Sequence, residues 1–254
     1  MMKSRFLFQG LIIIFSVFAA FVCAGSAFAA HPLITDDTGT QGKNRFQLEV
    51  NGEYANDNGD SLAEISASFS AGLTEKIDFV LGLPYQFLRV KDEAGERITE
   101  DGISDISIEM KWRFYEKDGL CLALKPGLTL DTGDDERGLG DGEASYSLFL
   151  ITTKEIEPLA FHFNLGYIKN REELRDIWHY SLAGEYEAFK DLKVVWDIGG
   201  ETNPDRETNT HPVFLLGGII YSIKENLDVD FGLKTGLNRA EADYTIMAGT
   251  AIRF

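Results

Sequence analysis

A histidine and a serine two residues apart, His179 and Ser181, form the pair that most closely resembles a catalytic site. In acyl transfer a histidine accepts the proton of a serine hydroxyl, and the serine oxygen then attacks a carbonyl carbon. An alternating strand turns Trp178, Tyr180 and Leu182 to the opposite side from this pair. We therefore expect a hydrogen-bonded pair on an inner face, with Glu185 on the same face, and keep a lipid or ester hydrolase as the alternative.

Acidic residues crowd the segment 132–143 and the residue before it. Its oxygen ligands would suit Ca²⁺, but the spacing matches no EF-hand, and the glycines open no helix that could hold a phosphate. We expect a solvated surface loop, with divalent cation binding left open. Asp36 and Asp37, which precede Thr38 and Gly39, are expected to stabilise a turn, with cation binding as the alternative. No metal site, cofactor or catalytic residue is predicted.

The elements that would position these residues are strands. From Phe46 onward the apolar residues recur with a period of two, as in Tyr244, Ile246 and Ala248 against the alternate Thr245 and Met247. About twelve such segments follow one another, and none of the sequence has a convincing helical period.

The connections between these segments alternate in length. Short turns such as 74–76, 189–191 and 224–226 alternate with longer, charged loops such as 91–102, 132–143, 169–176 and 203–212. This alternation is typical of outer-membrane barrels, which have short periplasmic turns and longer extracellular loops. We predict an all-β fold, a closed antiparallel transmembrane β-barrel of about 12 strands.

Charged residues of both signs share the face opposite the apolar one. A soluble barrel would have its apolar face inside, and so many charges do not suit a dry core. We therefore expect a narrow, polar lumen with cross-barrel ion pairs. The predicted lumen or substrate-path residues are Arg45, Glu49, Glu109, Lys111, Arg113, Lys125, His162, His179, Ser181, Glu185, Asp197, Asp228, Asp230, Lys234 and Arg253.

The start of the chain predicts export. Lys3 and Arg5 precede an apolar run, and Ala27-Phe28-Ala29 resembles a cleavage site, so residues 1–29 are interpreted as a signal peptide rather than a membrane anchor. Residues 30–43 are expected to form a periplasmic or lumen-plugging segment, and residues 44–254 the barrel.

The charge of the chain limits its partners. The formal net charge of −17 argues against nucleic acid as a partner. We expect contacts with outer-membrane lipid and lipopolysaccharide, and recognition of Tyr244 to Phe254 by the machinery that inserts barrels.

Several short motifs carry a family resemblance. They are HPLITDDTGTQGKNRFQLEV (His31 to Val50), LGLPYQF (Leu81 to Phe87), GISDISIEMKWRF (Gly102 to Phe114) and KPGLTLDTGDDERGLGDGE (Lys125 to Glu143). In this order they resemble the outer-membrane transporter family labelled for the MetA-pathway of phenol degradation. The resemblance implies uptake of small, often aromatic compounds, and it carries no catalytic residues.

These observations favour a non-enzymatic outer-membrane channel of a Gram-negative bacterium that takes up a small solute, aromatic or hydrophobic in class. The alternatives are the hydrolase that would use His179 and Ser181, and a structural barrel.

Overall fold

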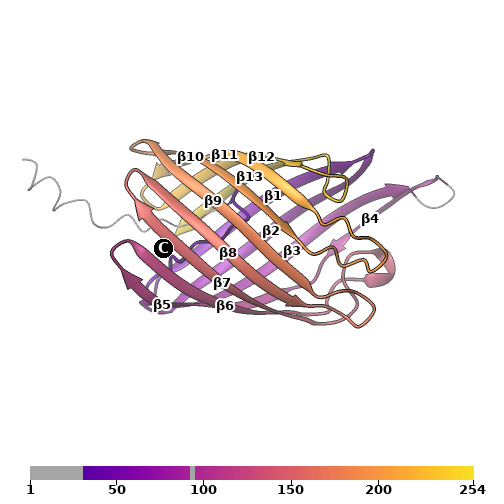
Figure 1. Ribbon diagram of the computed structural model, residues 1–254, viewed down its shortest axis with the longest axis horizontal. Helices are drawn as coiled ribbons and strands as arrows, with labels where there is room; N and C mark the ends of the chain where they lie inside the picture. Colours follow the sequence, from indigo (N-terminus) through magenta and orange to yellow (C-terminus); the bar gives the residue numbers. More distant parts are fainter. Residues whose placement is uncertain (1–30, 92–94) are drawn as a thin grey trace, which may run out of the picture.

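The computed structural model describes residues 31–91 and 95–254, which form one closed antiparallel β-barrel (Figure 1). Twelve of its strands form the ring, because β4 pairs only with the end of β3. The predicted signal peptide, residues 1–29, lies outside the described residues. The strands are β1 (Phe46–Asp57), β2 (Asp60–Thr74), β3 (Ile77–Lys91), β4 (Arg97–Ile103), β5 (Ser107–Lys117), β6 (Leu120–Thr129), β7 (Ser145–Ile156), β8 (Leu159–Lys169), β9 (Ile177–Phe189), β10 (Leu192–Glu201), β11 (Val213–Lys224), β12 (Leu227–Gly236) and β13 (Tyr244–Arg253).

The barrel closes through its first and last strands. β13 pairs with β1 from Tyr244 to Arg253, and Phe254 and Phe46 exchange two backbone hydrogen bonds of 3.0 and 2.8 Å. Their rings stack with centroids 5.8 Å apart. The prediction of a closed antiparallel barrel is confirmed.

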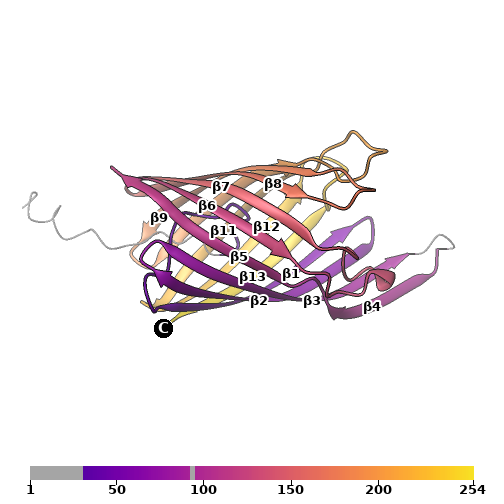
Figure 2. The same ribbon diagram turned by 90° about the horizontal axis from the view of Figure 1, so that it is seen from below.

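The prediction of a loop over residues 91–102 was wrong in part. β3 continues to Lys91, and β4 pairs with it from Tyr85 to Lys91 as a hairpin that projects beyond the rim (Figure 2). β5 then takes over as the partner of β3 from Ile77 to Gly82. Beyond the membrane both faces of a hairpin meet water, so β4 needs no apolar alternation, which is the pattern used to find the strands.

The two faces of the barrel wall differ in chemistry. On β9 the side chains of Trp178, Tyr180 and Leu182 are exposed, whereas His179 and Ser181 between them are buried. Exposed aromatic and aliphatic side chains recur on every strand of the ring except β6, which is the pattern expected of a lipid-facing surface. Among the residues described, no helix is long and apolar enough to cross a membrane.

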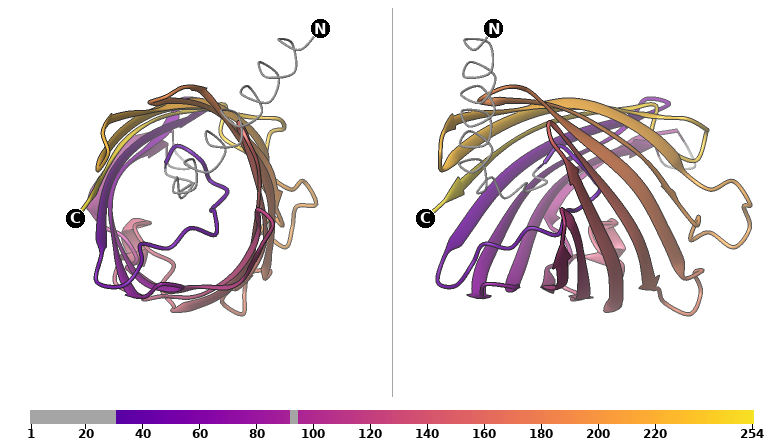
Figure 3. Two further views of the ribbon diagram at one scale, coloured as in Figure 1. Left: turned by 90° about the vertical axis from the view of Figure 1, so that its left-hand side faces the viewer. Right: turned by 60° about the vertical axis from the view of Figure 1, so that its left-hand side comes forward.

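The N-terminal segment, residues 31–43, crosses the inside of the barrel before β1 begins. Figure 3 shows it in the view along the barrel axis as an indigo strand of chain that spans the interior. Leu33 packs against Phe214, Leu216 and Met247, whose side chains point inward. The sheet makes room for the segment with glycines, since a Cβ on Gly218 or Gly232 would lie 2.7 or 2.6 Å from a carbon of Pro32.

Candidate functional site

Asp197 of β10 holds the middle of the N-terminal segment. Its carboxylate is fully buried and accepts hydrogen bonds from the backbone N–H groups of Ile34 and Thr35, both at 2.8 Å, and from the Thr35 hydroxyl at 2.7 Å. Three donors on one carboxylate satisfy a charge that would otherwise be costly to bury. The predicted lumen residue Asp197 therefore contacts the segment.

Asp36 forms the second attachment. Its two carboxylate oxygens contact Lys111 Nζ at 2.7 Å and Lys125 Nζ at 2.9 Å, on β5 and β6. Lys125 also lies 3.4 Å from Glu109. The expected ion pairs in the interior are therefore made in part by a residue of the segment rather than only between strands.

Further contacts hold both ends of the segment. His31 Nδ1 lies 2.5 Å from Asp230 Oδ1 on β12, and the Gln41 N–H donates to Asp78 of β3 at 2.8 Å. Between them, the Thr38 N–H donates to the Thr153 hydroxyl at 3.1 Å, and the Asn164 amide donates to the Asp36 carbonyl at 3.0 Å. The segment is thus fixed to strands all around the ring.

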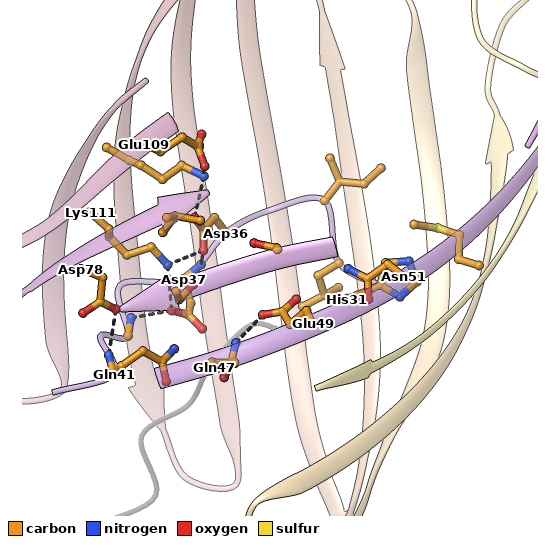
Figure 4. A pocket seen from close by; sticks show the side chains of 18 of the residues that line it. His31, Asp36, Asp37, Gln41, Gln47, Glu49, Asn51, Asp78, Glu109 and Lys111 are labelled. Carbon is orange, nitrogen blue, oxygen red and sulfur yellow. Dashed lines mark hydrogen bonds and ion pairs between the residues drawn. The ribbon is translucent and has the colours of Figure 1, made fainter. Parts of the chain in front are cut away.

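A cavity of about 380 Å³ remains between the segment and the strands β1, β2, β3, β5 and β6 (Figure 4). Carboxylates dominate its wall, and Ser68 and Ser70 of β2 also line it. The lining side chains with a charge or a titratable group are His31, Asp36, Asp37, Glu49, Glu53, Asp78, Glu109, Lys111 and Lys125.

The predicted lumen residues have different surroundings. Four of them line this cavity, namely Glu49, Glu109, Lys111 and Lys125. Others form pairs elsewhere on the inner wall: Arg253 with Asp228 at 2.7 Å, Lys234 with Glu241 at 3.0 Å, His162 with Glu185 at 3.6 Å, and Arg113 with Glu116 at 3.6 Å. Arg45 is exposed in the turn that precedes β1.

His179 and Ser181 form the expected hydrogen-bonded pair, Glu201 extends it into a row, and Glu185 is buried on the same inner face as expected. His179 Nε2 lies 3.1 Å from the Ser181 hydroxyl, and His179 Nδ1 lies 3.4 Å from Glu201 Oε2. Glu185 pairs with Lys193 at 2.7 Å. Ser181 is 3% exposed and is not among the residues that line the cavity described above.

The acidic loop after β6 wraps around one carboxylate. Asp105 accepts hydrogen bonds from the N–H groups of Thr132, Gly133 and Asp141 at 2.7–3.0 Å. The loop contains the short 3-10 helix η1 (Asp135–Arg137), and Leu139 beside it is buried. Across the described ranges, 31–91 and 95–254, no group of three or more His, Cys, Asp or Glu side chains is placed to hold a metal ion.

The loop between β8 and β9 is held by Asp176. Its carboxylate accepts hydrogen bonds from the Tyr167 hydroxyl at 2.5 Å and the Lys169 ammonium at 3.0 Å. These two donors stabilise the charged form and lower the pKa of Asp176 to about 2.

Sequence reasoning missed Asp78, His31 and the two serines of the cavity. Asp78 lies between Ile77 and Phe79 on the inward parity of β3, so the alternation could have identified it. His31 and Asp36 lie in a segment without a period, and no sequence signal relates such residues to particular strands.

Comparison with known structures places the fold among outer-membrane channels. An outer-membrane channel of Pseudomonas putida F1, COG4313, is 12% identical over 86% of this chain and 98% of its own, with a TM-score of 0.67. The NanC porin is 10% identical over 81% and 98%, with a TM-score of 0.60, and the KdgM porin, solved in complex with disordered oligogalacturonate, is 8% identical over 82% and 99%, with a TM-score of 0.53.

The comparison of sequences gives the family. A search of curated protein sequences found no match. A family model with the description "Putative MetA-pathway of phenol degradation" matches residues 29–254, which is nearly the whole chain and agrees with the motifs found in the sequence. This chain therefore belongs to the family of that description.

Proposed function

We propose that this protein is a passive channel of the Gram-negative outer membrane that admits small solutes. One observation carries the proposal: a closed ring of strands presents apolar side chains outward and a charged, partly open interior inward. A lipid-facing exterior and a polar interior are what a solute path across a bilayer requires. The outward side chains contact outer-membrane lipid and lipopolysaccharide in this proposal, and Tyr244 to Phe254 is the segment that insertion machinery recognises.

The size of the interior limits the solute. The N-terminal segment and its contacts leave a cavity of about 380 Å³, which is in the range of pockets that hold one small molecule. The family description names phenol degradation, so small aromatic compounds are the first class to test.

Planar bilayers test the channel directly. Purified protein should give small, discrete conductance steps, and proteoliposomes should swell in small permeant solutes but not in large ones. A complete seal under all voltages and salts, together with normal growth of a deletion strain on a panel of aromatic and aliphatic carbon sources, would refute the proposal. The panel also identifies the solute class.

The hydrolase is less well supported. Its only basis is the row of Ser181, His179 and Glu201, and the serine hydroxyl in that row is buried. Replacing Ser181 by Ala decides the question: a lipid or ester hydrolysis that the purified protein catalyses and the variant does not would favour the enzyme. For a purely structural barrel, with the interior serving no solute, we expect neither conductance nor a growth defect.

A further inference from the structure

Two carboxylates that face the cavity are buried and each has an oxygen without a partner. Asp78 is 3% exposed, and its Oδ2 accepts the Gln41 N–H while its Oδ1 accepts nothing. Asp37 is 1% exposed, and its Oδ2 is likewise without a hydrogen bond. A buried carboxylate oxygen without a donor is costly, so each of these atoms offers a place for a positively charged or hydrogen-bonding ligand.

The basic groups of the cavity do not supply that ligand. Lys111 and Lys125 both bind Asp36, and Lys111 also lies 3.8 Å from Asp37 Oδ1, the oxygen other than the one without a partner. His31 binds Asp230 and lies 3.7 Å from Glu53. The cavity wall holds six carboxylates, those of Asp36, Asp37, Glu49, Glu53, Asp78 and Glu109, against these three basic groups. The cavity therefore has an excess of negative charge even when His31 is protonated.

The register of the strands defines where a ligand would lie. Ser68 of β2 pairs with Glu49 of β1, and Ser70 pairs with Val80 of β3, two residues beyond Asp78. Neighbouring strands are about 4.8 Å apart, so β1 and β3 flank β2 at a separation of about 10 Å. Asp78 itself pairs with Gly72, four residues beyond Ser68, so Glu49 and Asp78 are also offset along the strands, and Ser68 and Ser70 lie on the stretch of β2 between their levels. Figure 4 shows both carboxylates in the same cavity as Asp36 and Asp37 of the N-terminal segment.

This spacing distinguishes between kinds of cation. Among the described side chains the carboxylates do not converge on one point in the way that a divalent metal ion coordinated directly by several protein ligands requires. A larger cation that shares its contacts among carboxylates, hydroxyls and water fits the space better. Alkali ions with part of their hydration shell and organic ammonium groups both have these properties.

We infer that this cavity is a binding site for a monovalent cation, an alkali ion or the ammonium group of a solute, attracted by the carboxylates of Asp78 and Glu49, with the hydroxyls of Ser68 and Ser70 lining the space between them. Its consequence for permeation, a preference for cations over anions, rests on the proposed channel function. The existence of the binding site does not rest on that function, because a cation can bind in the cavity whether or not it passes through the barrel.

Ion selectivity tests the permeation part. The reversal potential is measured across a bilayer in a potassium chloride gradient for the wild type, for Asp78→Asn, and for Asp78→Asn combined with Glu49→Gln. Both replacements keep an oxygen that can accept the existing hydrogen bonds. A unit charge about 7 Å from an ion in watery surroundings changes its occupancy by about threefold, so the ratio of potassium to chloride permeability should fall by about threefold for each carboxylate.

A matched control removes the same charge elsewhere. Glu172 and Glu173 are exposed in the loop between β8 and β9, and replacing both by Gln should leave the permeability ratio unchanged. Equal ratios in the wild type and the Asp78→Asn, Glu49→Gln variant would overturn the inference for permeation.

Crystals test the site independently of conduction. After a soak in rubidium chloride, anomalous scattering should show a peak between Glu49 and Asp78 that is lost in Asp78→Asn, Glu49→Gln crystals. Ethylammonium chloride added to the soak identifies the source: displacement of rubidium indicates the ammonium group of a solute, and retention indicates an inorganic ion. A cavity without rubidium would overturn the site, whereas rubidium bound in a protein that conducts nothing would support the site and refute the channel.

Discussion

Gly232→Ala should weaken the seating of the N-terminal segment on the barrel wall while leaving in place every residue that binds the segment. A Cβ at this position would lie 2.6 Å from Pro32 Cβ and 2.9 Å from Pro32 Cγ, while the next nearest atom is 3.8 Å away. Carbon atoms pack at about 3.5–4.0 Å, so Pro32 must withdraw by about 1 Å. Overpacking of this kind costs about 1–3 kcal/mol, which lowers the ratio of seated to displaced segment by about 5-fold to 150-fold.

Two measurements report how often the N-terminal segment is displaced. Single-channel conductance should rise, because the segment occupies the interior that solutes would cross. A cysteine reporter at Ile34, in a Cys121→Ser background, should react faster with a bulky maleimide. Ile34 suits this purpose because its backbone N–H, rather than its side chain, binds Asp197.

The neighbouring strand supplies the control. Gly217→Ala adds the same methyl group where nothing lies within 4 Å, so its conductance and labelling should match the wild type. Heat-modifiable gel mobility verifies that each barrel is closed. If Gly232→Ala forms a closed barrel with unchanged conductance and unchanged labelling, the segment does not narrow the path as reasoned here.

Further predictions concern the contact of Asp197 with the N-terminal segment, the two faces of the barrel and the loop between β8 and β9. Asp197→Ala removes three hydrogen bonds to a charged acceptor, each contributing about 1.5–3 kcal/mol, so the rate of labelling at Ile34 should rise. The control Asp228→Ala breaks the ion pair with Arg253 and should raise this rate less. Equal labelling rates in the two variants would contradict the role of Asp197 in holding the segment. Val50 is 40% exposed on the outer face, so Val50→Arg places a charge in lipid at a cost of about 2–4 kcal/mol near the midplane and should reduce the yield of heat-modifiable barrel. Ser66→Arg on the inner face should leave that yield unchanged. The reverse result would show that the assignment of inner and outer faces is wrong. The Asp176 carboxyl should titrate near its pKa of about 2 rather than near 3.8, and Tyr167→Phe should raise that midpoint in an NMR titration. Because this pKa is lowered in the folded protein, Asp176 stabilises its loop above pH 4 and loses that effect as the pH falls toward 2. The protection of the loop amides against hydrogen exchange should therefore stay constant between pH 7 and pH 5. A loss of protection over that range in the wild type, but not in Asp176→Asn, would contradict the assignment.

Much of the barrel could be predicted from the chain alone, for a physical reason. A strand that faces lipid on one side and a polar interior on the other must alternate with a period of two, so Trp178, Tyr180 and Leu182 indicated their direction without any tertiary information. The same parity placed Lys111, Lys125 and Asp197 inside. The period of two in Tyr244, Ile246 and Ala248 likewise predicted the strand at the end of the chain.

Where the alternation is weak, the sequence alone leaves the direction of the side chains ambiguous. β7 and β11 are apolar on both faces, and only the structure decided that Leu148 and Leu215 point outward while Phe214 and Leu216 pack on Leu33. β4 was not predicted because both faces of this hairpin meet water, so its residues need not alternate between apolar and polar.

The interior was decided by tertiary structure alone. Residues 31–43 have no regular period, so nothing in their order could relate Asp36 to Lys111 and Lys125, or His31 to Asp230. Those pairs arise because closure of the ring places β5, β6, β10 and β12 around the same interior. The N-terminal segment crosses that interior and pairs with the charged side chains that point inward from these strands. The parity of a strand is a local property of the sequence, whereas the partner of an inward charge depends on the closure of the whole sheet.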